Sequence, residues 1–454
     1  MKRLLIYNWC RLDDLSSSGG VGVYTRNLIS SLIKNPNYEI LYLNAGFSYT
    51  IDGKLRIRKN DNQYEKMVHS FEIINSPVIA PSPGQSVKNI KQYLEDESLY
   101  QLLRNWITSI GGIDIIHFQN LEGLSLKVLN LKKDFPNIRF IYSLHNYFPI
   151  CPLVNLWQTN HNCNRQSFLD CVNCFRRRSY TTTIIARKLN NSKVAEGFNY
   201  HLFREKPNQG DKFFFEKFHT ANKLAINNTM DCLLAVSDRV SKIFTYHGYN
   251  ENKIITSYIG SSVAKKSLSQ SNANEYASPF KIIFMGYMNA YKGFYFLINA
   301  LKALPDDFAK DMHVTICARF TRFTQFKELN EIRHLKKKFY GLDLINGYNS
   351  SNQQRILQGM HLGLVPVLWE DNLPQVLIEQ IAYGVPVLCS DLGGGKEIIN
   401  NPDFTFKAND VDDFTKKIIN IYSNREVLRE FWQHTQKLTS LEEHIKFLDA
   451  IYNQ

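Results

Sequence analysis

Short apolar runs alternate along the chain with longer segments in which apolar residues recur every three or four positions. In the N-terminal half, the runs expected to form strands are Leu4–Tyr7, Glu39–Leu43, Ile113–His117, Phe140–Leu144, Leu233–Val236 and Lys253–Ile259. Val21–Lys34 has helical spacing and ends at an Asn-Pro pair, and a second helix is expected at Phe213–Asn228. Strands that alternate with helices are typical of a parallel sheet covered by helices, so the pattern predicts an α/β fold.

The alternation restarts after Ser267–Ala277, a polar segment without periodicity that we interpret as an interdomain linker. The expected strands are Lys281–Met285, Val314–Ala318, Leu364–Leu368 and Val385–Ser390, and the expected helices are Phe294–Leu301, Ser351–Gln358, Pro374–Tyr383 and Val411–Ser423. We predict two doubly wound, Rossmann-like domains, over residues 1–266 (with an insertion at 151–230) and 278–424. The amphipathic helical tail, residues 425–454, is expected to pack back toward the N-terminal domain.

Composition fits this division. The chain has 454 residues, 44% hydrophobic and 21% charged, which describes a globular protein with two domains. The N-terminal apolar run is too short for a secretory signal, and no window approaches the ~20 apolar residues that span a bilayer. We therefore expect a cytoplasmic protein.

The net charge of +12 leaves several partners open. Nucleic acid is the least favoured, because no nucleic-acid-binding signature accompanies the basic residues. Phosphate-bearing substrates, an anionic membrane surface and a merely solubilising surface all remain. Arg176–Arg178, Arg187 and Lys188 of the insertion either dock on anionic headgroups at the inner face of the membrane, beside a lipid-linked acceptor, or form a solvated face.

The strongest motif is the acidic segment Trp369–Glu379, in which a strand, a short loop and a helix follow one another. A helix N-terminus near Pro374 presents unpaired N–H groups that suit a diphosphate. Asp371 on the loop can accept hydrogen bonds from sugar hydroxyls, and Glu379, about 1.4 turns into the helix, can reach a ribose diol. On spacing alone, two solvated surface carboxylates would be the better interpretation.

The context favours a site, because a Gly-Val-Pro-Val strand start and a Gly-Gly-Gly-Lys-Glu loop ending at Glu397 follow the helix. The whole block resembles the donor-site signature of the retaining glycosyltransferases of family 4, which have the GT-B fold, two Rossmann-like domains facing across a cleft. The resemblance implies that Asp371 contacts the donor sugar and that Glu379 holds the ribose. The family has Glu more often at the first position, and Glu370 is the alternative there.

The resemblance extends over most of the chain. It implies a glycine loop at Gly19 and Gly20 beside the donor, a functional His145 at the end of a strand, and a diphosphate-binding Lys292. His117 also ends a strand, but is interpreted as a structural histidine. The donor-binding residues implied are Gly19, Gly20, Gly286, Lys292, Arg319, Asn346, Glu370, Asp371, Asn372, Leu373 and Glu379.

One position departs from the family pattern. Where the family has a second phosphate-binding Arg, this chain has Tyr287. A cation is needed where negative charge grows on the leaving diphosphate, and Arg319, at the end of the next strand, is the candidate. Arg319 could equally be a surface residue. If it compensates, Arg319→Ala weakens diphosphate binding far more than Arg322→Ala.

Four cysteines, Cys151, Cys163, Cys171 and Cys174, fall within 24 residues. The Cys-x2-Cys spacing of the last two is a metal-chelating spacing, so a structural zinc ion is one expectation. The other gaps fit no standard zinc finger, and free thiols or a disulfide are the alternatives.

The resemblance implies transfer of a sugar from a nucleoside-diphosphate sugar to an acceptor hydroxyl, with retention of the anomeric configuration. His145, Asp371 and Lys292 are the implied catalytic residues. No catalytic metal or other required cofactor is expected, and the acceptor is a glycan or a lipid-linked molecule of bacterial surface polysaccharide or glycoconjugate synthesis. The alternatives are a non-catalytic subunit that binds a nucleotide sugar, and an epimerase or hydrolase of the same fold.

Overall fold

The computed structural model describes residues 1–14, 19–60, 68–81, 86–158, 161–163, 165, 167–175, 185, 188, 210–264, 276–321, 325–349 and 351–454. The chain divides into two compact units. Unit 1 comprises Met1–Thr159, Cys163–Ile259 and Leu441–Gln454, and unit 2 comprises Asn160–Asn162 and Gly260–Ser440. The sequence placed these boundaries near residues 266 and 424. Most of the linker predicted at Ser267–Ala277 lies outside the described residues.

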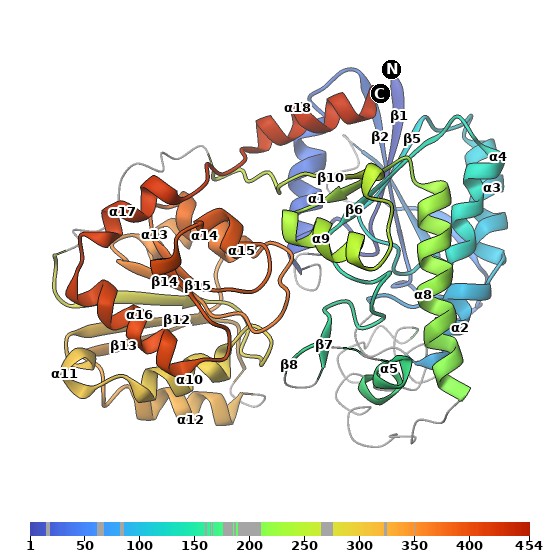
Figure 1. Cartoon of the computed structure of the whole chain (residues 1–454). Helices are drawn as coiled ribbons and strands as arrows, with labels where there is room; N and C mark the ends of the chain where they lie inside the picture. Colours follow the sequence, from blue (N-terminus) through green and yellow to red (C-terminus); the bar gives the residue numbers. More distant parts are fainter. Residues whose placement is uncertain are drawn as a thin grey trace. The chain divides into compact units, whose positions relative to one another are not determined.

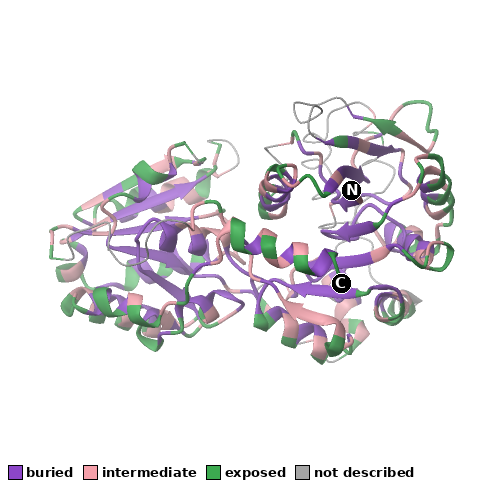
Figure 2. Ribbon diagram, turned by 90° about the horizontal axis from the view of Figure 1, so that it is seen from above, coloured by how far each residue is buried: buried purple, intermediate pink, exposed green. Residues whose placement is uncertain are grey.

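Unit 1 is built on an eight-stranded sheet in the order β10-β9-β6-β5-β1-β2-β4-β3 (Figure 1). Its strands are β1 (Lys2–Tyr7), β2 (Tyr38–Ala45), β3 (Arg56–Lys59), β4 (His69–Ile74), β5 (Ile115–Phe118), β6 (Arg139–Leu144), β9 (Cys232–Ala235) and β10 (Ile254–Thr256). All neighbours pair in parallel except β3, which runs antiparallel to β4. The central strands are buried on both faces, which explains why they are almost entirely apolar (Figure 2).

Helices cover both faces of this sheet. They are α1 (Gly19–Leu32), α2 (Val87–Glu95), α3 (Ser98–Ser109), α4 (Leu131–Asp134), α8 (Gly210–Thr229), α9 (Asp238–Tyr246) and α18 (Leu441–Tyr452), with the short turns η1 (Leu126–Asn130) and η2 (Glu251–Lys253). In Figure 1, α2, α3 and α8 lie on one side of the sheet, and α1 lies on the other beside α18. Helix α5 (Phe168–Cys174) and the two-residue strands β7 (Trp157–Gln158) and β8 (His161–Asn162) lie within the predicted insertion.

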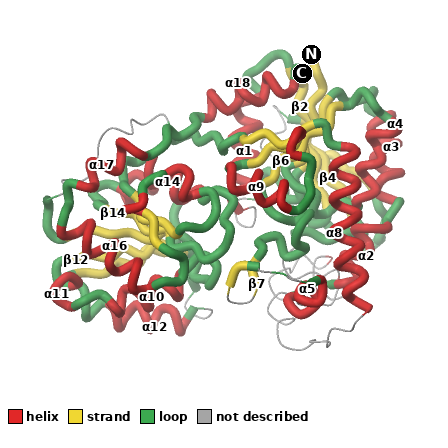
Figure 3. The backbone as a smooth tube through the Cα atoms, viewed as in Figure 1, coloured by secondary structure: helices red, strands yellow, loops and turns green. Residues whose placement is uncertain are grey.

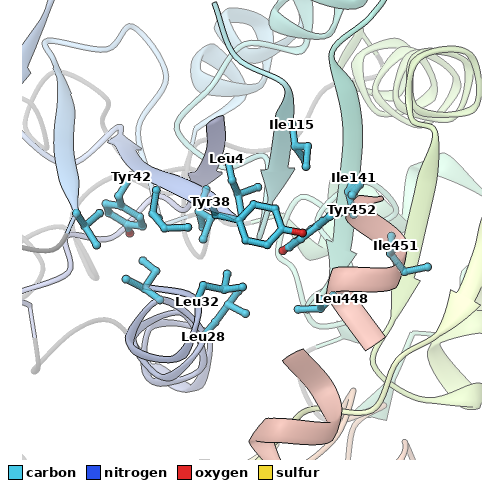
Figure 4. Packing of buried hydrophobic residues seen from close by; sticks show 14 of the residues in the cluster. Leu4, Leu28, Leu32, Tyr38, Tyr42, Ile115, Ile141, Leu448, Ile451 and Tyr452 are labelled. Carbon is cyan, nitrogen blue, oxygen red and sulfur yellow. The ribbon is translucent and has the colours of Figure 1, made fainter. Parts of the chain in front are cut away.

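The last helix of the chain completes the core of unit 1. Leu448 and Ile451 of α18 and Leu28 and Leu32 of α1 belong to one buried cluster that also contains Leu4 of β1 (Figure 4). Burial of each such side chain stabilises the unit by about 1.5–3 kcal/mol. This contact brings the two ends of the chain side by side in unit 1.

Unit 2 is built on a six-stranded parallel sheet in the order β13-β12-β11-β14-β15-β16. Its strands are β11 (Phe280–Met285), β12 (Met312–Ala318), β13 (Gly341–Asn346), β14 (Leu362–Val365), β15 (Val387–Ser390) and β16 (Thr405–Phe406). Its helices are α10 (Phe294–Ala303), α11 (Asp306–Ala309), α12 (Phe326–Leu335), α13 (Gln353–Leu357), α14 (Gln375–Ala382), α15 (Gly395–Ile399), α16 (Val411–Ser423) and α17 (Val427–His434), with the turn η3 (Pro402–Phe404). Helices α10 and α12 lie on one face of the sheet and α14 on the other (Figure 3).

Each strand predicted from an apolar run is present, which confirms the α/β prediction. Two predicted strands run past the observed C-terminal end by three residues: β10 ends at Thr256 and not at Ile259, and β14 ends at Val365 and not at Leu368, because Pro366 begins a loop. The helical tail is divided between the units, with α17 in unit 2 and only α18 in unit 1. In the described part of the chain, no helix is long and apolar enough to cross a membrane.

Candidate functional site

Three loops follow the carboxyl ends of β11, β14 and β15 in unit 2, where parallel sheets bind their ligands. The loop between β14 and α14 carries the predicted acidic motif. Helix α14 begins directly after Pro374, whose φ of −63° suits a helix start, and buries Leu377 and Ile381. The helix therefore fixes the acidic loop against the sheet.

The Lys292 ammonium forms an ion pair with the Asp371 carboxylate at 2.6 Å. The Asp371 side chain is 8% exposed and the Lys292 side chain 25% exposed, so the pair is largely withdrawn from solvent. The ammonium also lies 5.2 Å from the centroid of the Trp369 ring, against which Tyr291 packs edge-on. Lys292 and Asp371 are thus in direct contact although they are 79 positions apart in the sequence. Both were predicted to act on the donor.

A glycine allows Lys292 to reach this loop. Gly293 has a φ of 76°, and a Cβ atom there would lie 1.6 Å from the carbonyl oxygen of Pro366. No other residue fits without moving the backbone. The backbone N–H of Leu368 donates to the carbonyl of Tyr291 at 2.9 Å, which joins the two loops beside Lys292.

The glycines after β15 support the acidic loop. The N–H of Gly393 donates to Glu370 Oε2 at 3.1 Å, and the N–H of Gly394 donates to the carbonyl of Asp371 at 2.9 Å. A Cβ atom at Gly393 would lie 2.1 Å from that same carbonyl oxygen. Glycine N–H groups can approach a phosphate closely, but in the structure both of these are donated to the acidic loop.

Glu379 lies on α14, where Tyr348 donates its hydroxyl to Glu379 Oε2 at 3.1 Å. Burial raises the pKa of the Glu379 carboxyl to about 7, and the hydrogen bond from Tyr348 only partly offsets this. The carboxyl therefore changes its protonation state near neutral pH.

The remaining predicted donor-binding residues of unit 2 also lie near the carboxyl ends of its parallel strands. Gly286 follows β11, and its N–H donates to the carbonyl of Cys317. Asn372 and Leu373 are buried in the acidic loop. Asn346 ends β13 and accepts a hydrogen bond from the N–H of Phe320 at 3.0 Å.

Tyr287, which replaces the family's Arg, is 52% exposed. It lies close enough to Tyr291 and Tyr348 for its charge to affect their pKa values. Arg319 is exposed and packs its aliphatic part against Gly347. Whether Arg319 acts as the compensating cation stays a prediction, and Arg322, its proposed control, lies outside the described residues.

In unit 1, His145 follows β6 and is partly exposed. Its Nε2 lies 2.9 Å from Gln119 Oε1, and its ring lies 4.6 Å from the ring of Tyr24. Burial, together with the nearby His444, lowers the His145 pKa to about 3, so the ring is neutral at physiological pH. Gly19 and Gly20 form the first, exposed turn of α1 rather than a loop before it.

His117 is structural, as predicted. It is fully buried, and its two ring nitrogens lie 2.7 Å from the Tyr452 hydroxyl and 2.8 Å from Ser143 Oγ. Tyr452 comes from α18, at the far end of the chain. This partner could not be predicted from the sequence.

All four clustered cysteines are described and free of disulfides. Cys163 accepts a hydrogen bond from Gln158 Nε2, Cys171 accepts one from Arg165 Nη1, and Cys174 donates to the carbonyl of Trp157, at 3.6–3.7 Å. Among the described residues, no group of three or more His, Cys, Asp or Glu side chains is arranged to hold a metal ion. The zinc site stays a prediction that this geometry does not support. Arg176–Arg178 and Arg187 lie outside the described residues, and Lys188 is described only in isolation.

The sequence also contains an Asp-x-Asp tripeptide, Asp410-Val411-Asp412. Asp410 caps α16, since its side chain accepts a hydrogen bond from the N–H of Asp413 at 3.0 Å. This is a common structural use of Asp, worth about 1 kcal/mol.

Residues 265–438 match the model of the family described as Glycosyl transferases group 1. Among solved structures, the chain is similar to sucrose-phosphate synthase (tll1590) from Thermosynechococcus elongatus, at 13% identity and a TM-score of 0.61, over 100% of this chain and 99% of that one. It is similar to Anabaena Alr3699/HepE in complex with UDP-glucose, at 11% identity and a TM-score of 0.59, over 100% of both chains. It is also similar to the apo form of the lipopolysaccharide outer core galactosyltransferase WaaB, at 13% identity and a TM-score of 0.58, over 100% and 99%. No curated protein matches the sequence.

These findings define the class of the protein. The chain has the GT-B fold, with two Rossmann-like domains, as predicted. The residues that match glycosyl transferases group 1, 265–438, span almost all of unit 2, and the protein is a glycosyltransferase.

Proposed function

We propose that the enzyme transfers a sugar from a nucleoside-diphosphate sugar to an acceptor hydroxyl, with retention of configuration at the anomeric carbon. The observation that carries this proposal is the group of side chains at the carboxyl edge of the sheet in unit 2. Lys292 and Asp371 form a pair 2.6 Å apart, and Glu379 follows on α14. A cation for the diphosphate, a carboxylate for the sugar and a carboxylate for the ribose are the groups that such a donor requires.

Each group has one role in the proposed reaction. Lys292 and the N-terminus of α14, at Asn372–Pro374, stabilise the negative charge that grows on the diphosphate as the sugar–phosphate bond breaks. Asp371 and His145 orient the sugar while positive charge grows at its anomeric carbon. The acceptor oxygen attacks the face that the diphosphate leaves, and the departing phosphate takes the acceptor proton. This route uses no protein nucleophile and no metal.

The acceptor is proposed to be a glycan or lipid-linked molecule of surface polysaccharide or glycoconjugate synthesis, met at the inner face of the membrane. The similarity to WaaB, a lipopolysaccharide outer core galactosyltransferase, supports this class of acceptor. The net charge of +12 suits an anionic lipid surface.

Donor binding is tested by a thermal-shift screen against UDP, ADP, GDP and CDP and their common sugar derivatives. The proposal expects one base to raise Tm, with the shift abolished in Glu379→Ala. Glu430→Ala, which removes an exposed carboxylate from α17, is the matched control and retains the shift. Absence of any shift in folded protein would remove the proposed donor site.

Transfer is then tested with the identified donor and a set of glycan and lipid-linked acceptors. Retention predicts a product whose anomeric configuration, read from the proton coupling constant, equals that of the donor. Donor consumption without acceptor, at the rate seen with acceptor, would indicate a hydrolase or an epimerase instead.

A further inference from the structure

The Lys292–Asp371 pair poses a problem for donor binding. In the structure, the ammonium expected to hold the diphosphate is neutralised by a carboxylate 2.6 Å away. A diphosphate that approaches Lys292 must therefore displace Asp371 or share the ammonium with it. Asp371 is only 8% exposed, so solvent cannot readily satisfy its charge once the pair is broken.

The donor and the product differ in the hydrogen bonds that they can donate to the Asp371 carboxylate. A nucleoside-diphosphate sugar brings hydroxyl groups that donate hydrogen bonds to the carboxylate. The nucleoside diphosphate left after transfer has no sugar hydroxyls, and its ribose hydroxyls are taken by Glu379, so it leaves a largely buried Asp371 carboxylate without a partner beside its own negative charge. An unpaired buried charge of this kind is strongly destabilising.

The surroundings keep Lys292 in place when Asp371 is satisfied by another partner. The ammonium lies over the face of the Trp369 ring, which attracts a cation. The N–H of Lys292 donates to Asn289 Oδ1 at 2.9 Å, and Gly293 locks the following turn against Pro366. The lysine can therefore exchange its anionic partner without leaving the site.

We propose that Asp371 acts as an internal competitor for Lys292, so that the site prefers the sugar-bearing donor to the sugar-free nucleoside diphosphate and releases that product. The proposal rests on the proposed function, since it takes Lys292 and Asp371 to be the diphosphate and sugar contacts. It adds a selection step: the ion pair opens only for a ligand that supplies sugar hydroxyls.

The test measures the dissociation constants of UDP and UDP-glucose by calorimetry, or of the matching pair for another base chosen by the thermal-shift screen. Asp371→Asn removes the competing charge and retains the size of the side chain. We expect it to tighten UDP binding by about tenfold while it leaves UDP-glucose binding unchanged or weaker. Asp371→Glu, which keeps a carboxylate, is expected to preserve the discrimination of the native enzyme.

Asp391→Asn is the control, because it removes the same charge from the residue that directly follows β15, at the same edge of the sheet. Its carboxylate accepts a hydrogen bond from the N–H of Ala408 at 2.9 Å, and an asparagine oxygen can keep that bond. If Asp391→Asn tightens UDP binding as much as Asp371→Asn, a general charge effect replaces the proposal. Unchanged UDP binding in Asp371→Asn overturns it as well. Failure of the native protein to bind any nucleotide would instead refute the proposed function.

Product-inhibition kinetics distinguish competition between Asp371 and the diphosphate from a structural effect of the substitution. In Asp371→Asn the UDP product inhibits transfer at lower concentrations than in the native enzyme, whereas a distorted site binds UDP and UDP-glucose equally poorly. The inhibition constant for UDP should therefore fall while the KM for UDP-glucose does not.

Discussion

At the scale of single residues, the sequence predicts Lys292, Asp371 and Glu379 as donor contacts but does not predict their partners. Asp371 and Glu379 belong to one short motif, whereas Lys292 is implied by another segment of the family resemblance. That Lys292 pairs with Asp371, and that Tyr348 donates to Glu379, depends on how separate strands line up. A single sequence does not reveal such pairings, because the partners are 79 and 31 positions apart.

Glu379 makes donor binding depend on pH. Its folded-state pKa of about 7 exceeds its ordinary value, so it contributes stability that is complete below pH 4.5 and is lost as pH rises through 7. Donor binding should change in the opposite sense, because only the ionised carboxylate accepts two ribose hydroxyl bonds. We predict that affinity for UDP-glucose rises between about pH 6 and 8. This ligand is preferable to UDP, whose terminal phosphate itself titrates near pH 6.

Two variants identify the titrating group. Glu379→Gln should bind UDP-glucose weakly and with no pH dependence in this range. Tyr348→Phe removes the hydrogen bond that lowers the Glu379 pKa, so its affinity should rise at a higher pH than that of the native protein. A midpoint that stays in place in Tyr348→Phe would assign the titration to another group.

At the scale of elements, apolar periodicity predicted the buried parallel strands well and the edge elements poorly. β3 lies at the edge of the sheet in unit 1, and its exposed residues give it a polar sequence. β13 occupies the edge in unit 2 and is likewise partly exposed. An edge strand buries less apolar surface, so its sequence shows less of the pattern by which strands are recognised.

The turn from β11 into α10 is predicted to depend on one glycine. Gly293→Ala would put a Cβ atom 1.6 Å from Pro366 O in a left-handed backbone conformation. Gly359→Ala is the matched control, since its φ of 77° is similar but no atom lies within 4 Å of the added Cβ. In urea unfolding, the control should lower the free energy of unfolding by about 1–2 kcal/mol, and Gly293→Ala by about 1–3 kcal/mol more. Equal losses would show that the close approach to Pro366 does not matter.

At the scale of the whole molecule, the sequence predicted two Rossmann-like halves and a returning tail, but not where the return begins. The polar residues that hold α18 on unit 1 could not be assigned from sequence. Tyr24 and His444 lie 2.7 Å apart through their hydroxyl and Nε2 atoms, and Tyr38 donates to Asp449 at 2.6 Å. Each of these contacts joins residues more than 400 positions apart.

The last helix is therefore predicted to be an integral part of unit 1, and Tyr452→Phe tests this without disturbing its apolar packing. The substitution removes the hydroxyl that lies 2.7 Å from His117 Nδ1 and leaves a buried ring nitrogen without its partner. We expect the free energy of unfolding to fall by about 1–3 kcal/mol in urea denaturation. Tyr246→Phe, which removes a hydroxyl from a residue 87% exposed in the same unit, should have no measurable effect. Equal stability of the two variants would mean that the His117–Tyr452 contact does not hold α18 in place, and the apolar cluster around Leu448 would then account for its attachment alone.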